Sequence, residues 1–187
     1  MNSPANHCAA EMWAVWIACL PLAIAGCSPN AIDAGSAPQS APRSISLRVA
    51  GVEGYDETLA RLRGKVVLVD FWATWCAPCI EQFPHTVALE GKYHDRGLAV
   101  VGVSLNEPDE EPQVREFLAR HEADFENLLS EYGSGVAAIK AFGLPGPIPC
   151  YRLYDRSGEL HREFAVDPRA KRQFTPEDID AAIAELL

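Results

Sequence analysis

Residues 66–79 of this 187-residue chain read VVLVDFWATWCAPC, and this stretch decides the fold. Residues 66–72 are apolar apart from Asp70, as expected for a central strand that is covered on both faces. The strand leads to Cys76 and Cys79, whose spacing at a helix start turns both thiols to one side, where they can form a short disulfide. Unpaired N–H groups and the dipole at a helix N-terminus stabilise a thiolate. The stretch therefore predicts a strand-to-helix turn that carries a dithiol–disulfide site.

A C-x-x-C pair can also be half of a zinc site, or it can lie inert in a core. The chain has six cysteines, but it contains no second C-x-x-C pair and no H-x-x-x-H pattern. The preceding strand and the flanking Trp72 and Trp75 favour redox chemistry over both alternatives. We therefore expect neither a metal nor a cofactor at this site.

The composition is that of an ordinary globular protein, with 48% hydrophobic and 22% charged residues. The chain is long enough for one domain with a substantial core. Its formal net charge is −10, so the sequence offers no basic patch that could displace counterions from nucleic acid phosphates. Nucleic acid is therefore not an expected partner.

The N-terminal segment has features of a bacterial export signal. Residues 12–26 are apolar, but this run is shorter than the roughly 20 residues that a membrane-spanning helix needs. It fits the apolar part of a signal peptide, although no Lys or Arg precedes Arg43. Its end, IAGC at residues 24–27, resembles a lipobox, which implies a signal peptide over residues 1–26 and a lipid on Cys27. An uncleaved anchor is the alternative, and in both cases the protein is held at a membrane.

The segment after Cys27 differs in composition from the rest of the chain. Residues 27–43 are rich in Ser, Ala, Pro and Gly and have few bulky apolar side chains, which predicts a flexible tether. The folded domain is expected to cover residues 44–187.

Strands and helices alternate along that domain. We expect strands at residues 45–49, 66–72, 98–105, 125–129, 150–154 and 160–165. We expect helices at residues 55–62, 76–93, 112–121, 136–142 and 176–187. Pro84 is expected to interrupt the second helix, and Thr175 and Asp178 mark the N-terminus of the last one. The acidic stretch from Glu107 to Glu111 is interpreted as a solvated loop before a helix, with a docking patch as the alternative.

With these features in place, the chain resembles a thioredoxin fold, and more narrowly the membrane-tethered TlpA/ResA-like thiol-disulfide oxidoreductases of bacterial envelopes. The resemblance rests on residues 70–79, on Pro84, and on Pro149 with Asp155 six residues beyond it. It implies an α/β fold with a central mixed sheet flanked by helices. It also implies a family-type insertion around residues 106–147.

The resemblance assigns roles to the residues of the site. Cys76 would be the exposed nucleophile and Cys79 the buried resolving thiol, and the two would form a disulfide. Cys76 would attack a substrate disulfide, and Cys79 would then cleave the mixed disulfide. Trp75 would shield the site and contact the substrate. Pro149 would be a cis-proline facing the disulfide, with Ile148 offering backbone groups to the substrate, although trans geometry remains the alternative.

Two further residues have open interpretations. Asp70 is a carboxylate in an apolar strand, where burial would raise its pKa so that it could accept or return the proton of the resolving thiol. Alternatively, it only satisfies backbone donors. Some relatives carry an acid three places after the second cysteine, where this chain has Gln82. Cys150 is interpreted as a small core residue, with a redox role as the alternative.

The expected function is that of an envelope thiol-disulfide oxidoreductase that reduces selected exported proteins, for example in cytochrome c maturation. Ala77 and Pro78 give Cys76 neither a side-chain hydrogen bond nor a positive charge, which favours a reducing couple. Expected partners are proteins with disulfides, a membrane electron-donor protein, and the membrane itself through the lipid anchor.

Two other functions remain open at this point. One is a disulfide-forming oxidant or isomerase on the same fold. The other is a non-enzymatic copper-carrier lipoprotein that uses Cys76, Cys79 and a distant histidine.

Overall fold

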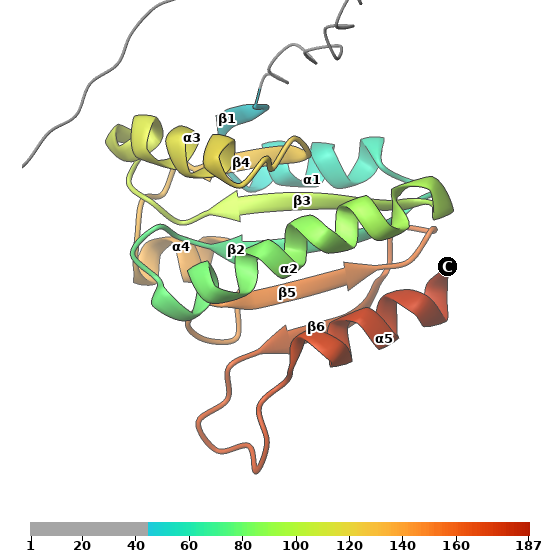
Figure 1. Ribbon diagram of the computed structural model, residues 1–187. Helices are drawn as coiled ribbons and strands as arrows, with labels where there is room; N and C mark the ends of the chain where they lie inside the picture. The colour runs from blue at the N-terminus through green and yellow to red at the C-terminus, as the bar shows by residue number, and fades with distance from the viewer. Residues whose placement is uncertain (1–44) are drawn as a thin grey trace, which may run out of the picture. The chain divides into compact units, whose positions relative to one another are not determined.

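The computed structural model describes residues 45–187, which fold around one mixed β-sheet (Figure 1). The strands, in chain order, are β1 (Leu47–Ala50), β2 (Val66–Trp72), β3 (Leu98–Ser104), β4 (Glu126–Ser130), β5 (Cys150–Tyr154) and β6 (Leu160–Ala165). Their order in the sheet is β1-β4-β3-β2-β5-β6. In the sheet, β1, β4, β3 and β2 run parallel to one another. Strand β5 is antiparallel to both of its neighbours, β2 and β6. The site-bearing strand β2 therefore lies near the centre of the sheet.

Helices cover both faces of the sheet (Figure 1). On one face lie α1 (Val52–Arg61) and α4 (Val136–Ala141), where the rings of Tyr55 and Phe142 pack on Phe71. On the other face lie α2 (Ala77–Tyr93), α3 (Glu111–Arg120) and α5 (Pro176–Leu186). Two short 3₁₀ helices, η1 (His94–Arg96) and η2 (Pro108–Glu110), complete the described elements. This layered arrangement is the expected α/β fold.

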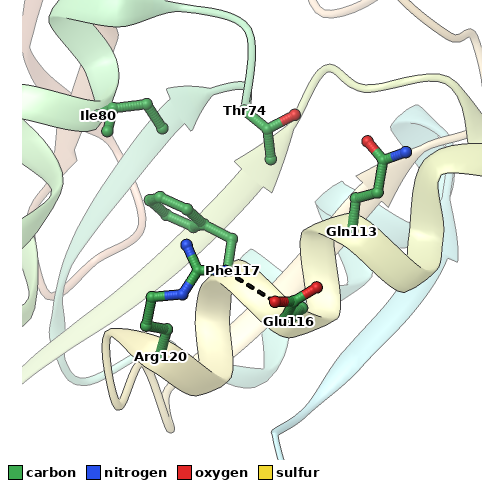
Figure 2. A pocket seen from close by; sticks show the side chains of 6 residues that line it. All are labelled: Thr74, Ile80, Gln113, Glu116, Phe117 and Arg120. Atoms are coloured by element: carbon green, nitrogen blue, oxygen red, sulfur yellow. Dashed lines mark hydrogen bonds and ion pairs between the residues drawn. The ribbon is translucent and has the colours of Figure 1, made fainter.

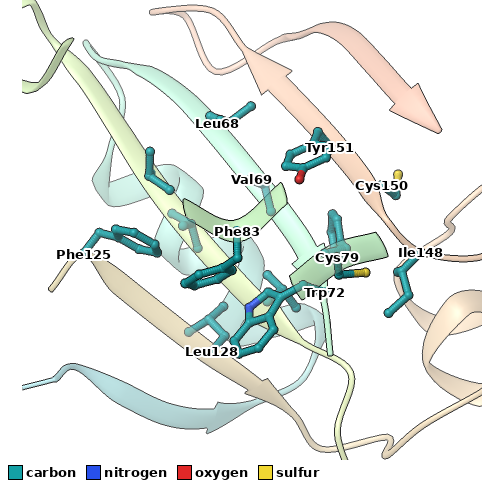
Figure 3. Close-up of a cluster of buried hydrophobic side chains, with 14 of the residues drawn as sticks. Leu68, Val69, Trp72, Cys79, Phe83, Phe125, Leu128, Ile148, Cys150 and Tyr151 are labelled. Atoms are coloured by element: carbon teal, nitrogen blue, oxygen red, sulfur yellow. The ribbon is translucent and has the colours of Figure 1, made fainter. Parts of the chain in front are cut away.

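The core fixes α2 on β2. Every residue of β2 and β3 is buried, as the continuous apolar runs predict. The ring of Trp72 packs against Phe83 of α2 and Phe117 of α3, with centroids 4.7 and 4.8 Å apart. Figure 3 shows Trp72 and Phe83 in this cluster, together with Cys79 and Ile148. The packing of large aromatic rings thus holds the N-terminus of α2 at the end of β2.

Several local predictions are confirmed. Strands β2 and β3, which precede and follow α2, are parallel neighbours, so α2 forms the expected crossover connection between them. β5 and β6 form an antiparallel hairpin, in which Asp155 Oδ1 accepts a hydrogen bond from the backbone N–H of Ser157. Thr175 and Asp178 form a capping box at the start of α5. These features depend on residues that are close in sequence, which is why the sequence predicts them.

The predicted interruption at Pro84 is wrong, because α2 is continuous from Ala77 to Tyr93. Proline lacks the N–H that would donate to the carbonyl of the residue four places earlier, but a helix tolerates this loss when packing holds it. Here the buried face of α2 includes Cys79, Phe83 and Thr86, on both sides of the proline. Helix α1 likewise starts earlier than predicted, at Val52.

Three expectations fall on residues that lie outside the described part of the chain. They are the signal peptide over residues 1–26, the tether over residues 27–43 and the lipid on Cys27. Among the helices of residues 45–187, none has the length and apolar character needed to cross a bilayer.

Candidate active site

Cys76 and Cys79 lie where β2 leads into α2, and a disulfide with an S–S distance of 2.08 Å joins them. Cys76 is the N-cap of α2, and Cys79 is the third residue of the helix. The first turn contains no acidic side chain. No negative charge there therefore reduces the positive potential that the helix N-terminus creates at the sulfurs. When the disulfide is reduced, this position favours the thiolate of Cys76.

Access to the two sulfurs differs. Cys76 is 6% exposed and Cys79 is 1% exposed. Cys76 is thus the more accessible of the pair, but it is less open than the exposed nucleophile that the family resemblance implies. The reason is the segment before β5, whose Ile148 carbonyl oxygen lies 3.8 Å from Cys76 Sγ. The neighbouring Trp75 is the open part of the site, with 53% of its surface exposed.

The segment that covers Cys76 contains the expected proline. The peptide bond between Ile148 and Pro149 is cis, and both residues are buried. In the disulfide, Cys76 Sγ carries no proton, so its contact with the Ile148 carbonyl is not a hydrogen bond. A reduced thiol at the same place can donate one to that oxygen. The structure thus brings Ile148 and Pro149 to the dithiol across a long sequence separation.

Asp70 lies beneath α2 and is 1% exposed. Its Oδ2 accepts a hydrogen bond of 2.7 Å from the hydroxyl of Thr86, whereas Oδ1 has no hydrogen-bond partner within residues 45–187. Burial raises the pKa of Asp70 from 3.8 to about 7, and the hydrogen bond from Thr86 opposes this rise. At neutral pH this carboxyl can therefore both bind and release a proton.

Tyr151 and Gln82 extend the polar contacts beneath α2. Tyr151 is the register partner of Asp70 on β5, and its hydroxyl donates to Gln82 Oε1 at 3.4 Å. Burial and the nearby Asp70 raise the pKa of Tyr151, so its hydroxyl stays neutral. The sequence assigned no role to Tyr151 or Thr86. A signal was present, because Thr86 is a polar residue seven places after Cys79 on the same helix face.

Asn106 is a second residue that sequence reasoning missed. Its side chain is fully buried, and its Oδ1 accepts from the backbone N–H of Thr74 at 2.9 Å. Its Nδ2 donates to the hydroxyl of Thr74 at 2.6 Å and to Glu110 Oε2 at 2.9 Å. Asn106 therefore fixes the loop that leads into Trp75 and Cys76. A polar residue directly after a buried strand is the sequence signal for such a contact.

The acidic stretch is exposed before α3, as predicted, but part of it is a short 3₁₀ helix with hydrogen-bonded carboxylates. Residues 108–110 form η2, and Glu110 Oε2 accepts from the backbone N–H of Glu107 at 2.9 Å. Glu107 Oε1 in turn accepts from both the backbone N–H and the hydroxyl of Ser134, which lower the pKa of Glu107. The hydrogen bonds from Ser134 to Glu107 join two loops that are distant in sequence, whereas the contacts of Glu110 are local.

An open groove lies between α3 and the segment that contains Thr74 and Ile80, which flank the two cysteines in sequence (Figure 2). The residues that line it are Thr74, Ile80, Gln113, Glu116, Phe117 and Arg120. Arg120 and Glu116 form an ion pair of 2.8 Å along α3, as the dashed line in Figure 2 marks. This groove and the exposed Trp75 give the site an accessible flank.

Cys150 is fully buried on β5 and takes no part in the disulfide. Burial raises the pKa of its thiol to about 12, so the thiol stays protonated at neutral pH. An inaccessible, protonated thiol is a poor nucleophile. The surroundings of Cys150 therefore favour its interpretation as a core residue.

Comparison with known proteins gives a consistent family match. The Redoxin family profile matches residues 36–183 of the chain. The thiol-disulfide oxidoreductase ResA of Halalkalibacterium halodurans is 31% identical over 118 residues, which is 63% of this chain and 64% of that protein. The chain thus matches less than two thirds of that relative's length.

Solved structures share the fold. A candidate thiol:disulfide interchange protein DsbE from Chlorobium tepidum superposes with a TM-score of 0.56 and 29% identity, covering 68% of this chain and 84% of that one. A second thiol:disulfide interchange protein of the thioredoxin family, from Chlorobium tepidum TLS, gives a TM-score of 0.52 and 25% identity, covering 68% and 83%. The predicted thioredoxin fold, with a mixed sheet flanked by helices, is confirmed.

Proposed function

We propose that this chain, which belongs to the Redoxin family, is a thiol-disulfide oxidoreductase that acts on disulfides of other proteins. One observation carries the proposal: a C-x-x-C disulfide at the N-terminus of α2, between the exposed Trp75 and the Ile148 carbonyl. The similarity to ResA and to thiol:disulfide interchange proteins supports the same activity.

The reaction has two exchange steps. The Cys76 thiolate attacks a substrate disulfide, which forms a mixed disulfide and releases one substrate thiolate. The Cys79 thiol then loses its proton and attacks Cys76 Sγ, which releases the second substrate thiolate and forms the Cys76–Cys79 disulfide. The substrate gains two electrons and the protein loses two. The buried position of Cys79 one turn into α2 suits it to this internal attack.

Asp70 is the group that we assign to proton transfer in the second step. Its pKa of about 7 allows the carboxylate to accept the Cys79 proton near neutral pH and to return it later. No hydrogen bond joins Asp70 to either cysteine within residues 45–187; its carboxyl is bonded to Thr86.

The direction that we propose is reduction of the substrate. The loop residues Ala77 and Pro78 offer Cys76 no charge and no side-chain hydrogen bond, so the thiolate is stabilised mainly by the helix N-terminus. A less stabilised thiolate makes the couple more reducing. The proposed substrates are selected exported proteins, for example in cytochrome c maturation, and a membrane electron-donor protein would restore the dithiol.

Equilibration with glutathione buffers tests this direction. We expect a midpoint potential nearer to about −270 mV, the thioredoxin value, than to about −120 mV, the value of the strong oxidant DsbA. The Cys76→Ser/Cys79→Ser variant is the control for the other thiols of the chain. A potential close to that of DsbA would contradict the reducing role and favour the alternative, a disulfide-forming oxidant or isomerase.

The proposed location is the bacterial cell envelope, with the domain held at the membrane by a lipid on Cys27 after removal of residues 1–26. The IAGC sequence at residues 24–27 supports this proposal. In a bacterial host, we expect the wild-type protein in the membrane fraction and Cys27→Ala outside it. Equal membrane association of both proteins would argue for an uncleaved anchor instead.

The copper-carrier alternative gains no support from the site. Residues 45–187 contain no cluster of three or more His, Cys, Asp or Glu side chains placed to hold a metal ion.

A further inference from the structure

Thr86 lies on the same buried face of α2 as the resolving cysteine. It follows Cys79 by seven residues, which is two helical turns or roughly 10 Å along the axis. Thr86 and Asp70 are each 1% exposed, and the Thr86 hydroxyl lies 2.7 Å from Asp70 Oδ2. Within the described residues, this hydroxyl is the only hydrogen-bond partner of the carboxyl.

The other groups around Asp70 are neutral. From β5, Tyr151 and Cys150 approach it, and burial raises the pKa of both. The facing residue of β3 is Gly102, which has no side chain. The buried residues of α5 are apolar: Ile179, Ala182 and Ile183.

On α2, the remaining titratable neighbours are Cys79 and His85. Cys79 is held in the disulfide, and His85 interacts electrostatically with Glu177 and Asp180 of α5. No charged side chain contributes to the pKa of Asp70, which burial raises and Thr86 lowers. Among the described residues, the Thr86 hydroxyl is therefore the one hydrogen-bond partner that favours the ionised state of this carboxyl.

The Thr86 hydroxyl can hydrogen-bond to Asp70 in both protonation states of the carboxyl. It donates to the ionised carboxylate, as the 2.7 Å contact allows. When the carboxyl is protonated, the same oxygen can accept its proton, because a helical threonine can turn its O–H to the carbonyl four residues earlier, here that of Gln82. Valine has the same branched shape but can do neither.

We propose that Thr86 is a positioning residue that controls when Asp70 takes up and releases the proton of the exchange reaction. This proposal rests on the proposed oxidoreductase function. Thr86 holds the carboxyl beneath α2 in both protonation states and stabilises the ionised state, in which Asp70 can act as the base.

The test compares Thr86→Val with Thr86→Ser, which keeps the hydroxyl. Carboxyl carbon NMR signals of the oxidised full-length protein are followed from pH 4 to pH 10, and Asp70→Asn identifies the Asp70 signal. In Thr86→Val, the Asp70 midpoint should rise by about one pH unit or more, since a hydrogen bond to a buried charge is lost. The rise of the exchange rate with pH should move to higher pH by the same amount. Thr86→Ser should titrate like the wild type.

Thr86→Ala, which also lacks the hydroxyl, replaces Thr86→Val if that variant does not fold. If the wild type exchanges thiols and both hydroxyl-free variants titrate like it, this proposal alone is overturned. If the wild type exchanges no thiols with any protein disulfide, the proposed function is overturned and this proposal with it. The titration separates the two failures, because it needs no substrate.

Discussion

Replacing Asp70 with asparagine is expected to stabilise the protein above neutral pH and to slow disulfide exchange in the same variant. The stabilising effect comes from burial. A folded-state pKa of about 7, against 3.8 for an unperturbed aspartate, means that the folded protein keeps a proton which the unfolded chain has already lost. Across this pH range the free energy of unfolding therefore falls as pH rises.

The size of this effect follows from the two pKa values. The free energy of unfolding should fall by about 4 kcal/mol between pH 4 and pH 8 because of Asp70 alone. In Asp70→Asn this contribution disappears. The asparagine Nδ2, however, would take the place of Oδ1, which has no hydrogen-bond partner. Burying this unpaired donor costs about 1–3 kcal/mol of stability. The net gain at pH 8 should therefore be about 2 kcal/mol.

Urea denaturation of the oxidised protein at several pH values measures this prediction. Asp56→Asn, which changes an exposed aspartate on α1, is the matched control and should leave stability almost unchanged. The exchange rate of Asp70→Asn should fall by about 10²-fold at neutral pH, because the proton acceptor is lost. A variant that is destabilised at pH 8, or that exchanges at the wild-type rate, would contradict the buried-base interpretation.

Cys79→Ser should leave a substrate fragment attached to Cys76. When the reduced wild type reacts with an aromatic disulfide such as Ellman's reagent, Cys76 releases one thiolate and Cys79 then releases the second. In Cys79→Ser, the hydroxyl cannot perform the second step, so one thiolate is released and the mixed disulfide persists. Cys76→Ser should react far more slowly, because Cys79 is 1% exposed.

The released thiolate and the mass of the protein measure this result. The Cys76→Ser/Cys79→Ser variant gives the contribution of the remaining cysteines, which is subtracted. With a protein disulfide, the Cys79→Ser adduct should appear on a non-reducing gel and disappear on reduction. Release of both thiolates by Cys79→Ser, or faster adduct formation in Cys76→Ser than in Cys79→Ser, would show that the assigned order of attack is wrong.

Much of the fold could be predicted because its signals are local. The apolar run of β2 and the Cys76–Cys79 spacing indicate a strand that ends at a helix start, and both depend on residues adjacent in sequence. The capping box of Thr175 with Asp178 is equally local. The cis geometry at Pro149 differs, because the sequence alone does not predict it and the expectation came from family resemblance.

The predictions that failed concern long-range contacts. The continuity of α2 through Pro84 depends on packing against β2, not on the propensity of proline. Glu107 is exposed, as predicted, but its carboxylate also accepts hydrogen bonds from Ser134 on another loop, a contact that the sequence pattern does not show. Cys76 is covered by a segment some seventy residues later in the chain.

The sequence by itself determined that a buried strand leads to two cysteines at a helix N-terminus. This arrangement also determined the class of chemistry, which is dithiol–disulfide exchange. Periodicity, capping and spacing act over one or two turns, and a single chain segment contains all the groups that they need. Only the tertiary structure decided that Asp70 bonds to Thr86, that the Ile148 carbonyl lies over Cys76, and that Asn106 holds Thr74. These contacts join segments that meet only when helices and loops pack on the sheet, where burial raises the energetic importance of each polar partner.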